Sequence, residues 1–254
     1  MRRVVFNQKG GVGKSTITCN LAAIAAASGQ RTLVVDLDTQ ANSTRYLLGR
    51  DAPAPAQGAA EFFDATLKFS IRGTPAADFV VPTPWERLHL MPASAALEEL
   101  HGKLESRYKI YKLREALAAL ADDYDQIWID TPPALNFYTR SALIAAQACL
   151  IPFDCDDFSR QALYTLLTSV AEIQADHNAA LQVEGIVVNQ FQARASLPQR
   201  TVQELVDEGL PVLTPYLSAS VKIKESHERG LPMIHLESRH KLTQEYLALY
   251  AQLA

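Results

Sequence analysis

Residues 9–16 read Lys-Gly-Gly-Val-Gly-Lys-Ser-Thr and lie between a short apolar run, Val4–Phe6, and an amphipathic helical pattern. A glycine-rich segment that joins a strand to a helix in this way predicts a phosphate-binding loop. The usual pattern has a glycine five residues before the Gly-Lys pair. This chain has Gln8 at that position and a second lysine, Lys9, directly after it. The departure narrows the prediction from nucleotide-binding proteins in general to one subclass of them.

The residues of this loop have separate expected roles. Backbone N–H groups from Gly11 to Thr16 are expected to point at the phosphates, at the positive end of the following helix. Lys14 is expected to reach the β- and γ-phosphates, and the Ser15 hydroxyl is expected to ligate Mg²⁺. The alternative, a glycine-rich turn without a ligand, leaves the lysine, the hydroxyls and the helix unexplained. The loop residues predicted to bind the nucleotide are Gly10, Gly11, Val12, Gly13, Lys14, Ser15 and Thr16.

Length and composition limit the class of protein. The chain has 254 residues, 48% of them apolar, which is enough for a large core without disulfides or structural metals. A net charge of −4 excludes a uniformly basic nucleic-acid binder, so any DNA contact must come from a local patch. Cys19, Cys149 and Cys155 form no Cys-x-x-Cys pair and are typical of reduced thiols in a cytosolic protein. No apolar run approaches the ~18 residues of a membrane span.

Apolar runs alternate with helical patterns along the chain. Continuous apolar runs are typical of parallel strands that are covered on both faces. The alternation predicts a single domain over residues 1–254, a P-loop domain given the predicted phosphate loop, with a doubly wound α/β fold: a mostly parallel sheet with helices on both faces, in three Rossmann-like layers. The predicted strands are Arg3–Phe6, Thr32–Asp36, Leu88–Met91, Gln126–Asp130, Ala148–Phe153, Val183–Val188 and Pro211–Leu213. The predicted helices are Lys14–Ser28, Tyr111–Ala121, Ser159–His177 and Leu197–Glu208.

Aspartates stand at the ends of two predicted strands. Asp36 and Asp38 would project to the same face if the strand continued, at the sheet edge where α/β proteins bind ligands. Two neighbouring carboxylates favour a cation or polar ligand: one can steady Mg²⁺ and its waters while the other orients an attacking water. The alternative is a cluster that caps a helix beginning near Ser43. Asp130, which ends the second strand, is expected to hold Mg²⁺ through a water.

With these elements in order, the chain resembles the ParA/MinD family of deviant-Walker ATPases. The resemblance extends over nearly the whole length and is strongest to the short ParA-like, or Soj-like, members. The family typically has Asp-x-Asp-Pro-Gln, whereas Thr39 replaces the proline here, and we expect this change to loosen a switch segment without abolishing function. The matching segments are residues 7–16, 36–42, 130–133, 221–226 and 230–232.

The resemblance implies an ATP-sandwiched homodimer with Mg²⁺. In it, Lys9 would cross the interface to the partner's phosphates, although a solvated lysine beside an acidic ligand is the alternative from the residue alone. Asp38 would position the lytic water, and Asp36 and Asp130 would serve the magnesium shell. The catalytic residues are therefore expected to be Lys9, Lys14 and Asp38. The resemblance also assigns Asn189 and Pro215 to the nucleotide; the alternative for Asn189 is a strand-end turn.

The two branches of the family bind different surfaces. MinD-like members use a basic amphipathic C-terminal helix on membranes. The last helical pattern here offers no lysine or arginine on the polar face that we assign to it, so we interpret its apolar stripe as core packing and expect no membrane binding. That stripe consists of Tyr246, Leu249, Tyr250 and Leu253.

ParA-like members bind DNA without sequence preference. Several lysines and arginines late in the chain could neutralise phosphates, although a solvated helical face of mixed charge is the alternative. We expect a cytoplasmic, nucleoid-associated ATPase that positions a cargo, with slow hydrolysis stimulated by a ParB-like or adaptor protein. A MinD-like membrane-surface ATPase and a P-loop kinase or synthetase acting on a small molecule are the alternatives. The predicted DNA-binding residues are Lys222, Lys224, Arg229 and Arg194.

Overall fold

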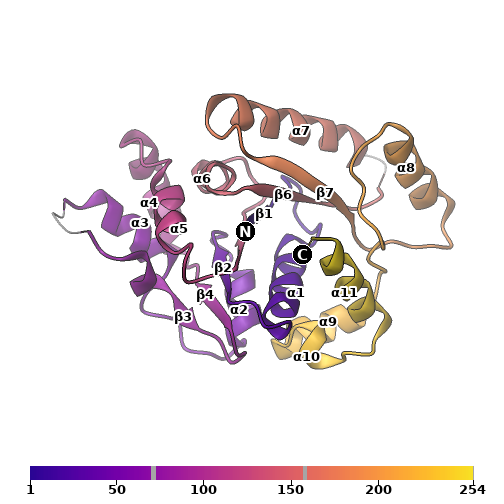
Figure 1. The fold of residues 1–254 in the computed structure, drawn as a ribbon, viewed down its shortest axis with the longest axis horizontal. Coiled ribbons are helices and arrows are strands. Elements are labelled where there is room, and N and C mark those ends of the chain that lie inside the picture. Colours follow the sequence, from indigo (N-terminus) through magenta and orange to yellow (C-terminus); the bar gives the residue numbers. More distant parts are fainter. Residues whose placement is uncertain (70–72, 157–158, 254) are drawn as a thin grey trace.

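The fold is built on one seven-stranded sheet. The computed structural model describes residues 1–69, 73–156 and 159–253, and it arranges the strands in the order β3-β4-β2-β5-β1-β6-β7 (Figure 1). Every pairing is parallel except that of β3 with β4. The strands are β1 Arg2–Val5, β2 Thr32–Asp36, β3 Val81–Pro82, β4 Leu88–Met91, β5 Gln126–Asp130, β6 Ala148–Phe153 and β7 Gln182–Val188. The predicted mostly parallel α/β sheet is confirmed.

Helices cover both faces of this sheet. Figure 1 shows α6 and α7 on one side of β6 and β7, and α1 and α11 on the other. The helices are α1 Lys14–Ala27, α2 Asn42–Leu48, α3 Ala59–Leu67, α4 Ala96–Ser106, α5 Lys112–Ala119, α6 Phe137–Ala145, α7 Ser159–Asp176, α8 Ser196–Asp207, α9 Lys222–Arg229, α10 Met233–Leu236 and α11 Lys241–Leu253, with a 3₁₀ turn at Ala76–Phe79. The four helices predicted from periodicity are α1, α5, α7 and α8, each within a few residues of its predicted bounds.

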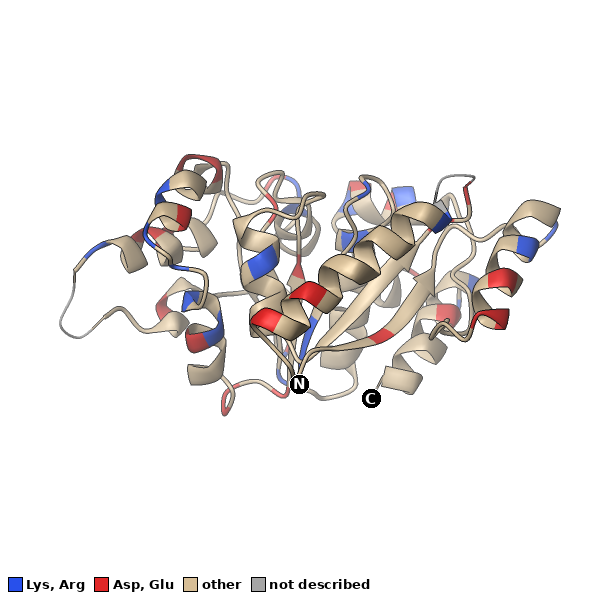
Figure 2. Cartoon of the chain, turned by 90° about the horizontal axis from the view of Figure 1, so that it is seen from above, with Lys and Arg blue, Asp and Glu red and all other residues tan. Residues whose placement is uncertain are grey.

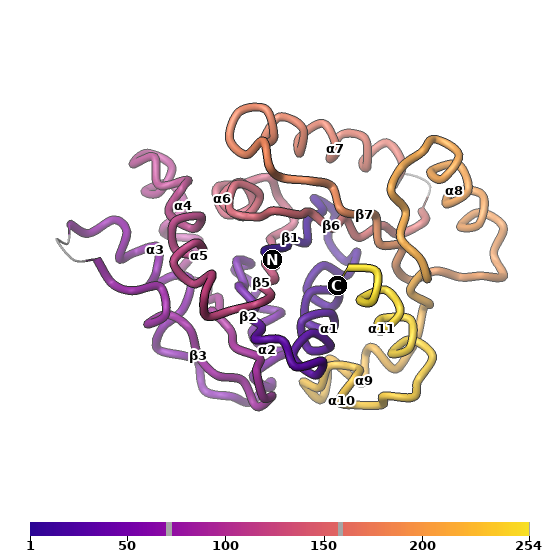
Figure 3. The backbone as a smooth tube through the Cα atoms, viewed as in Figure 1, coloured from indigo at the N-terminus to yellow at the C-terminus, as the bar shows by residue number. Residues whose placement is uncertain are grey.

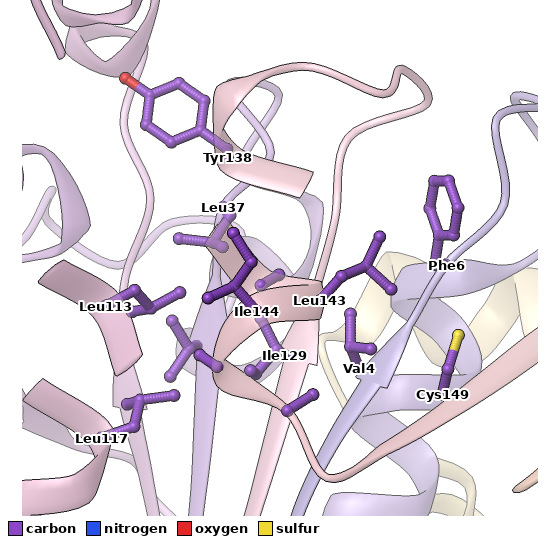
Figure 4. Packing of buried hydrophobic residues seen from close by; sticks show 14 of the residues in the cluster. Val4, Phe6, Leu37, Leu113, Leu117, Ile129, Tyr138, Leu143, Ile144 and Cys149 are labelled. Atoms are coloured by element: carbon purple, nitrogen blue, oxygen red, sulfur yellow. The ribbon is translucent and has the colours of Figure 1, made fainter. Parts of the chain in front are cut away.

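Each face of the sheet has its own hydrophobic core, because successive strand residues point to opposite faces. In β1, Val4 belongs to the cluster under α3 to α8, whereas Val5 belongs to the cluster under α1 and α11. Figure 4 shows Leu143 and Ile144 of α6 packed beside Val4 and Ile129 of the sheet. The last residues of the central strands β1, β2 and β5 are all buried between the two clusters.

The predicted strand Pro211–Leu213 is wrong. Only Val212 makes a ladder contact, a single parallel bridge to Ile186. Pro211 has no N–H to donate to a ladder. The side chain of Leu213 lies directly over Gly185, where a Cβ atom would be 2.4 Å from Leu213 Cδ1. The segment therefore lies alongside β7 and forms a single bridge, in which the Ile186 N–H donates to the Pro211 carbonyl and the Leu213 N–H donates to the Ile186 carbonyl, but it does not continue as a strand.

The two ends of the chain lie side by side. Figure 2 shows both termini at the same edge of the molecule, and the guanidinium of Arg3 donates a hydrogen bond to the carbonyl of Leu253. The predicted apolar stripe of the last helix packs in the core: Tyr246 and Leu249 are fully or almost fully buried against the face that carries α1. Among the described residues, no helix is both long enough and apolar enough to span a membrane.

Candidate nucleotide-binding site

The glycine-rich segment forms a tight loop between β1 and α1. Gly11 and Gly13 have φ angles of 78° and 95°, a region that favours glycine. A Cβ atom on Gly13 would also lie 2.3 Å from Asn189 Nδ2. The helix begins at Lys14 with no side-chain cap on its first turn. The open N–H groups and the helix dipole therefore suit an anion at this end of α1.

A cavity of about 560 Å³ opens above this helix start. Its wall combines loop residues with the segment after β2, the helix α2 and the helix α9, which come from distant parts of the chain (Figure 3). It brings together many of the predicted nucleotide-binding residues and Asp38. The lining residues are Gly10, Gly11, Gly13, Lys14, Ser15, Thr16, Asp38, Gln40, Asn42, Arg45, Tyr46, Arg50, Pro133 and His227.

Lys14 lines this cavity and is itself buried. Its side-chain ammonium donates to the carbonyl of Lys9 at 3.1 Å, inside the loop that it would share with a phosphate. Burial lowers the pKa of Lys14, whereas the charges of Asp130 and Asp38 raise it. A poorly solvated cation in this position gains much from a bound phosphate, since its charge is only partly compensated by the protein.

Asp36 and Asp130 end neighbouring strands and face each other in register. Both residues are completely buried. Burial is the main cause that raises the pKa of each carboxyl, and the charge of Asp130 adds to the effect on Asp36. Two carboxylates this close disfavour each other's ionisation. The pair is consequently a place where a cation would be stabilised.

The oxygens of the two carboxylates are used differently. Asp36 accepts hydrogen bonds on both oxygens, from the backbone of Asp38 at 3.1 Å and from the N–H and hydroxyl of Thr44. These bonds satisfy the first turn of α2, whose own N-cap residue, Ala41, has no side-chain cap. Asp130 accepts from the Ser43 hydroxyl at 2.7 Å on Oδ2.

The remaining oxygen of Asp130 fits a hydrated magnesium ion. Asp130 Oδ1 is buried and has no partner at normal hydrogen-bond geometry among the described residues, although the nearby Ser15 hydroxyl lowers the pKa of the Asp130 carboxyl. Mg²⁺ at phosphate sites keeps several waters and uses few protein ligands. The residues present therefore fit an ion held by the Ser15 hydroxyl and, through water, by Asp130. The contacts of Asp36 order α2, and its place in the magnesium shell stays a prediction.

Asp38 stands outside the strand, in the wall of the cavity. One of its oxygens accepts the backbone N–H of Gln40 at 3.0 Å, which fixes the turn that leads into α2. Asp38 is almost fully buried, so its carboxylate is turned toward the cavity and away from bulk water. This position suits a group that orients a water beside a phosphate, which stays a prediction for Asp38.

Lys9 projects toward the segment after β6. Its ammonium contacts Asp154 Oδ2 at 2.7 Å and also Asp156. Partial burial lowers the pKa of Lys9, but hydrogen bonds to Asp154 and Asp156 raise it, and the net result is a pKa above the usual value. Lys9 is therefore charged, and in this single chain its charge is paired with carboxylates of the same chain.

Asn189 supports the loop from the end of β7. Its side-chain amide donates to the carbonyl of Val12 at 2.9 Å, and the residue also lines a second cavity of about 570 Å³ beside the first turn of α1. Pro215 does not line this cavity, although Ser218, three residues later in the sequence, does. An adenine contact of Asn189 and a nucleotide contact of Pro215 stay predictions.

Sequence reasoning missed cavity residues on the two helices that face the loop. Arg45, Tyr46 and Arg50 come from α2 and the residues after it, and His227 comes from α9. His227 Nε2 lies 2.9 Å from the hydroxyl of Thr16. No spacing rule pairs positions so far apart; only the folded chain brings them to one cavity.

The predicted DNA-binding residues differ in how their charges are compensated. Lys222 pairs with Glu225 at 2.8 Å and with Glu237 at 3.2 Å, and Arg229 pairs with Glu225 at 3.1 Å. Lys224 and Arg194 are exposed, and within the described part of the chain no acidic side chain forms an ion pair with either. Figure 2 shows basic and acidic residues mixed along the helices.

Comparisons with known proteins agree with this architecture. Residues 3–183 match the family model described as an AAA domain. The chain is 32% identical to the chromosome partitioning protein ParA of Myxococcus xanthus, over 98% of this chain and 86% of the relative. It is 30% identical to the sporulation initiation inhibitor protein Soj of Bacillus subtilis, over 98% of this chain and 96% of the relative.

A solved structure with the same fold contains a nucleotide. Cobyrinic acid a,c-diamide synthase of Mycobacterium smegmatis, with bound ADP and magnesium, superposes with a TM-score of 0.83 at 26% identity. The match covers 99% of this chain and 93% of that chain. A protein with this fold can therefore hold both a nucleotide and a magnesium ion.

Proposed function

Since this chain belongs to the AAA domain family and to the ParA/Soj group of partition ATPases, we propose that it binds and hydrolyses ATP with Mg²⁺ in order to position a cargo in the cell. Residues 1–254 would act as a single ATPase domain. ATP would be held between two copies of the chain, and its hydrolysis would be slow until a ParB-like or adaptor protein stimulates it.

One observation carries the proposal. The cavity over the first turn of α1 is lined by Lys14, Ser15 and Asp38, while Asp130 lies buried with one oxygen that has no hydrogen-bond partner in the described part of the chain. A phosphate chain needs such a cation and donors, and a hydrated Mg²⁺ needs such oxygens. When bound, Mg²⁺ would supply neutralisation of the phosphate charge.

We propose that the ATP-bound dimer binds DNA without sequence preference and is therefore located on the nucleoid. Support comes from the kinship with chromosome-partitioning proteins and from Lys224 and Arg194, which are exposed and form no ion pair with an acidic side chain of residues 1–69, 73–156 and 159–253. Electrostatic contacts of this kind need no base recognition and weaken as salt rises. The covered apolar stripe of α11 disfavours the membrane alternative, because an amphipathic anchor needs a free apolar face.

The test is DNA binding and dimerisation of the full chain with ATP, with ADP and without nucleotide, over a salt series. ATP should favour the dimer and strengthen DNA binding, and Lys14→Ala should lose both responses because it no longer holds the phosphates. Lys109 does not line this cavity, so Lys109→Ala serves as the matched control. Equal DNA binding in all three nucleotide states would contradict the proposal.

The second candidate function is that of an enzyme of small-molecule metabolism, because the fold is similar to that of a synthase. Such an enzyme would turn over quickly only in the presence of its acceptor, at about 1–100 s⁻¹ if it resembled kinases. ATP hydrolysis that is slow alone and rises with DNA and a partner protein favours the partition ATPase. Hydrolysis that depends on a small acceptor, with no response to DNA, favours the synthase-like enzyme.

A further inference from the structure

The hydrogen bond between Thr16 and His227 joins the phosphate loop to a helix more than two hundred residues away in sequence. Thr16 belongs to the first turn of α1, and His227 belongs to α9. Both residues line both cavities, the one above the loop and the one beside it. The contact between Thr16 Oγ1 and His227 Nε2 measures 2.9 Å. A nucleotide in either cavity would lie against this pair.

The histidine ring is held in place by α2. The rings of His227 and Tyr46 meet edge to face, with centroids 4.9 Å apart and planes at 88°. Such pairs restrict the orientation of both rings. The Tyr46 hydroxyl in turn bonds to Ser226, the neighbour of His227, and accepts from the Asn20 amide at 3.1 Å. The imidazole therefore has a defined position although it is exposed toward the cavities.

The same contacts lead back to the loop. The Asn20 amide also donates to the Thr16 carbonyl at 2.8 Å, and the Asn20 side-chain oxygen accepts the backbone N–H of Met233 at 2.7 Å. Thr16 is thus held by α1 through its carbonyl and by α9 through its hydroxyl. The direction of the Thr16 hydroxyl proton depends on whether Nε2 of His227 donates or accepts the hydrogen bond.

The chemistry of the two groups selects one arrangement when a phosphate is present. A neutral imidazole carries one N–H donor and one acceptor nitrogen, and a hydroxyl is both donor and acceptor. If Nε2–H donates to Thr16 Oγ1, the Thr16 proton remains available for an anionic oxygen. The opposite arrangement would turn the lone pairs of Thr16 toward the anion, which is unfavourable.

We propose that His227 is a positioning residue for nucleotide binding, which donates from Nε2 to Thr16 Oγ1 and so directs the Thr16 hydroxyl at a phosphate oxygen of a bound nucleoside di- or triphosphate. The inference rests on the proposed ATP binding and names a residue that the loop motif does not contain. A contact made equally before and during the reaction changes affinity and leaves kcat unchanged.

The test uses two variants of this histidine. His227→Phe keeps a ring against Tyr46 but removes both nitrogens, and it should weaken binding of fluorescent ADP and ATP about fivefold to tenfold. KM for ATP should rise by the same factor while kcat stays within about twofold. His227→Gln places an amide nitrogen near the position of Nε2, and it should restore affinity to within about twofold of the wild type.

A double variant separates positioning from general stability. Because His227 acts through the Thr16 hydroxyl, His227→Phe should have almost no further effect on affinity in a Thr16→Val background. His235→Phe is the matched control, since His235 is likewise exposed and stacks on Trp85 with a centroid distance of 4.1 Å outside both cavities. Should His227→Phe fail to fold, His227→Asn, whose amide is too short to reach Thr16, replaces it.

The outcomes are distinguishable. A wild-type protein that binds nucleotide, with an affinity unchanged in His227→Phe or reduced additively with Thr16→Val, overturns this inference and leaves the proposed function intact. A folded wild-type protein that binds neither ADP nor ATP overturns both. Weakened binding in His227→Phe, recovery in His227→Gln and no additivity support the positioning role.

Discussion

Lys9 Nζ lies 2.7 Å from Asp154 Oδ2, so the additional lysine of the phosphate loop is paired within its own chain. Asp154 belongs to the segment that follows β6, and Asp156 of the same segment also contacts the ammonium. In the proposed dimer, Lys9 would have to exchange these carboxylates for the phosphates of the partner's nucleotide. In the proposed dimer, this ion pair would therefore compete with dimerisation.

Weakening this pair should favour the ATP-bound dimer. Asp154→Asn removes one charge that holds Lys9, and an exposed ion pair contributes about 0.2–1 kcal/mol. The ATP-dependent dimerisation constant, measured by analytical ultracentrifugation, should rise by up to about fivefold. In the double variant Lys9→Ala/Asp154→Asn, the increase in the dimerisation constant that Asp154→Asn causes should disappear. A weaker dimer in Asp154→Asn would mean that Asp154 itself stabilises the interface.

Replacing Asp38 should separate binding from hydrolysis. Asp38→Ala leaves Lys14 and Ser15 in place, so ATP binding should stay within about threefold of the wild type, whereas the loss of a water-orienting carboxylate should reduce kcat by about 10²-fold or more. Single-turnover hydrolysis with labelled ATP measures the effect. Asp51→Ala, in the exposed loop after α2, is the control. Hydrolysis at the wild-type rate would refute the water-positioning role.

Lysines and arginines without an ion pair among the described residues should contribute more to DNA binding than ion-paired ones do. Lys224→Ala and Arg194→Ala should each weaken binding and reduce the salt slope by about 1, because each removes one phosphate contact. Lys222→Ala should have the smaller effect, since Glu225 and Glu237 already compensate that charge. Fluorescence anisotropy of the ATP-bound protein with two unrelated duplexes measures both quantities. A larger effect for Lys222→Ala would reverse this order.

An ion pair beside β2 and β5 makes stability depend on pH. Hydrogen bonds from Arg31 lower the pKa of Asp125 to about 2, below the value of about 3.9 expected in the unfolded chain. The stabilisation is therefore present above pH 4 and is lost as the pH falls from about 4 to 2.

Asp125→Asn consequently should lower the melting temperature at pH 7, and its difference from the wild type should shrink toward pH 2. Thermal unfolding at several pH values measures this, with Asp51→Asn as the surface control. A difference that stays constant down to pH 2 would exclude the Arg31 pair as its cause.

Local sequence was sufficient for the central strands and the phosphate loop. Thr32–Asp36 and Gln126–Asp130 are continuous apolar runs that end in a carboxylate, and the structure has strands with these bounds. The glycines before Lys14 likewise specify a turn whose φ angles few other residues adopt. Pro211–Leu213 shows the limit of the same reasoning, because β propensity cannot tell whether a segment beside the sheet forms a strand or only a single bridge.

Motifs along the chain are enough to predict the residue types expected around a phosphate: Lys14 and Ser15 in the loop, and aspartates at strand ends. The contacts that these residues make follow from the packing of the folded chain. Strand register sets Asp36 beside Asp130, the segment after β6 brings Asp154 to Lys9, and α9 brings His227 to Thr16. Motifs arise from neighbouring residues and are readable along the chain, whereas these pairs depend on how helices and strands pack, which no local spacing encodes.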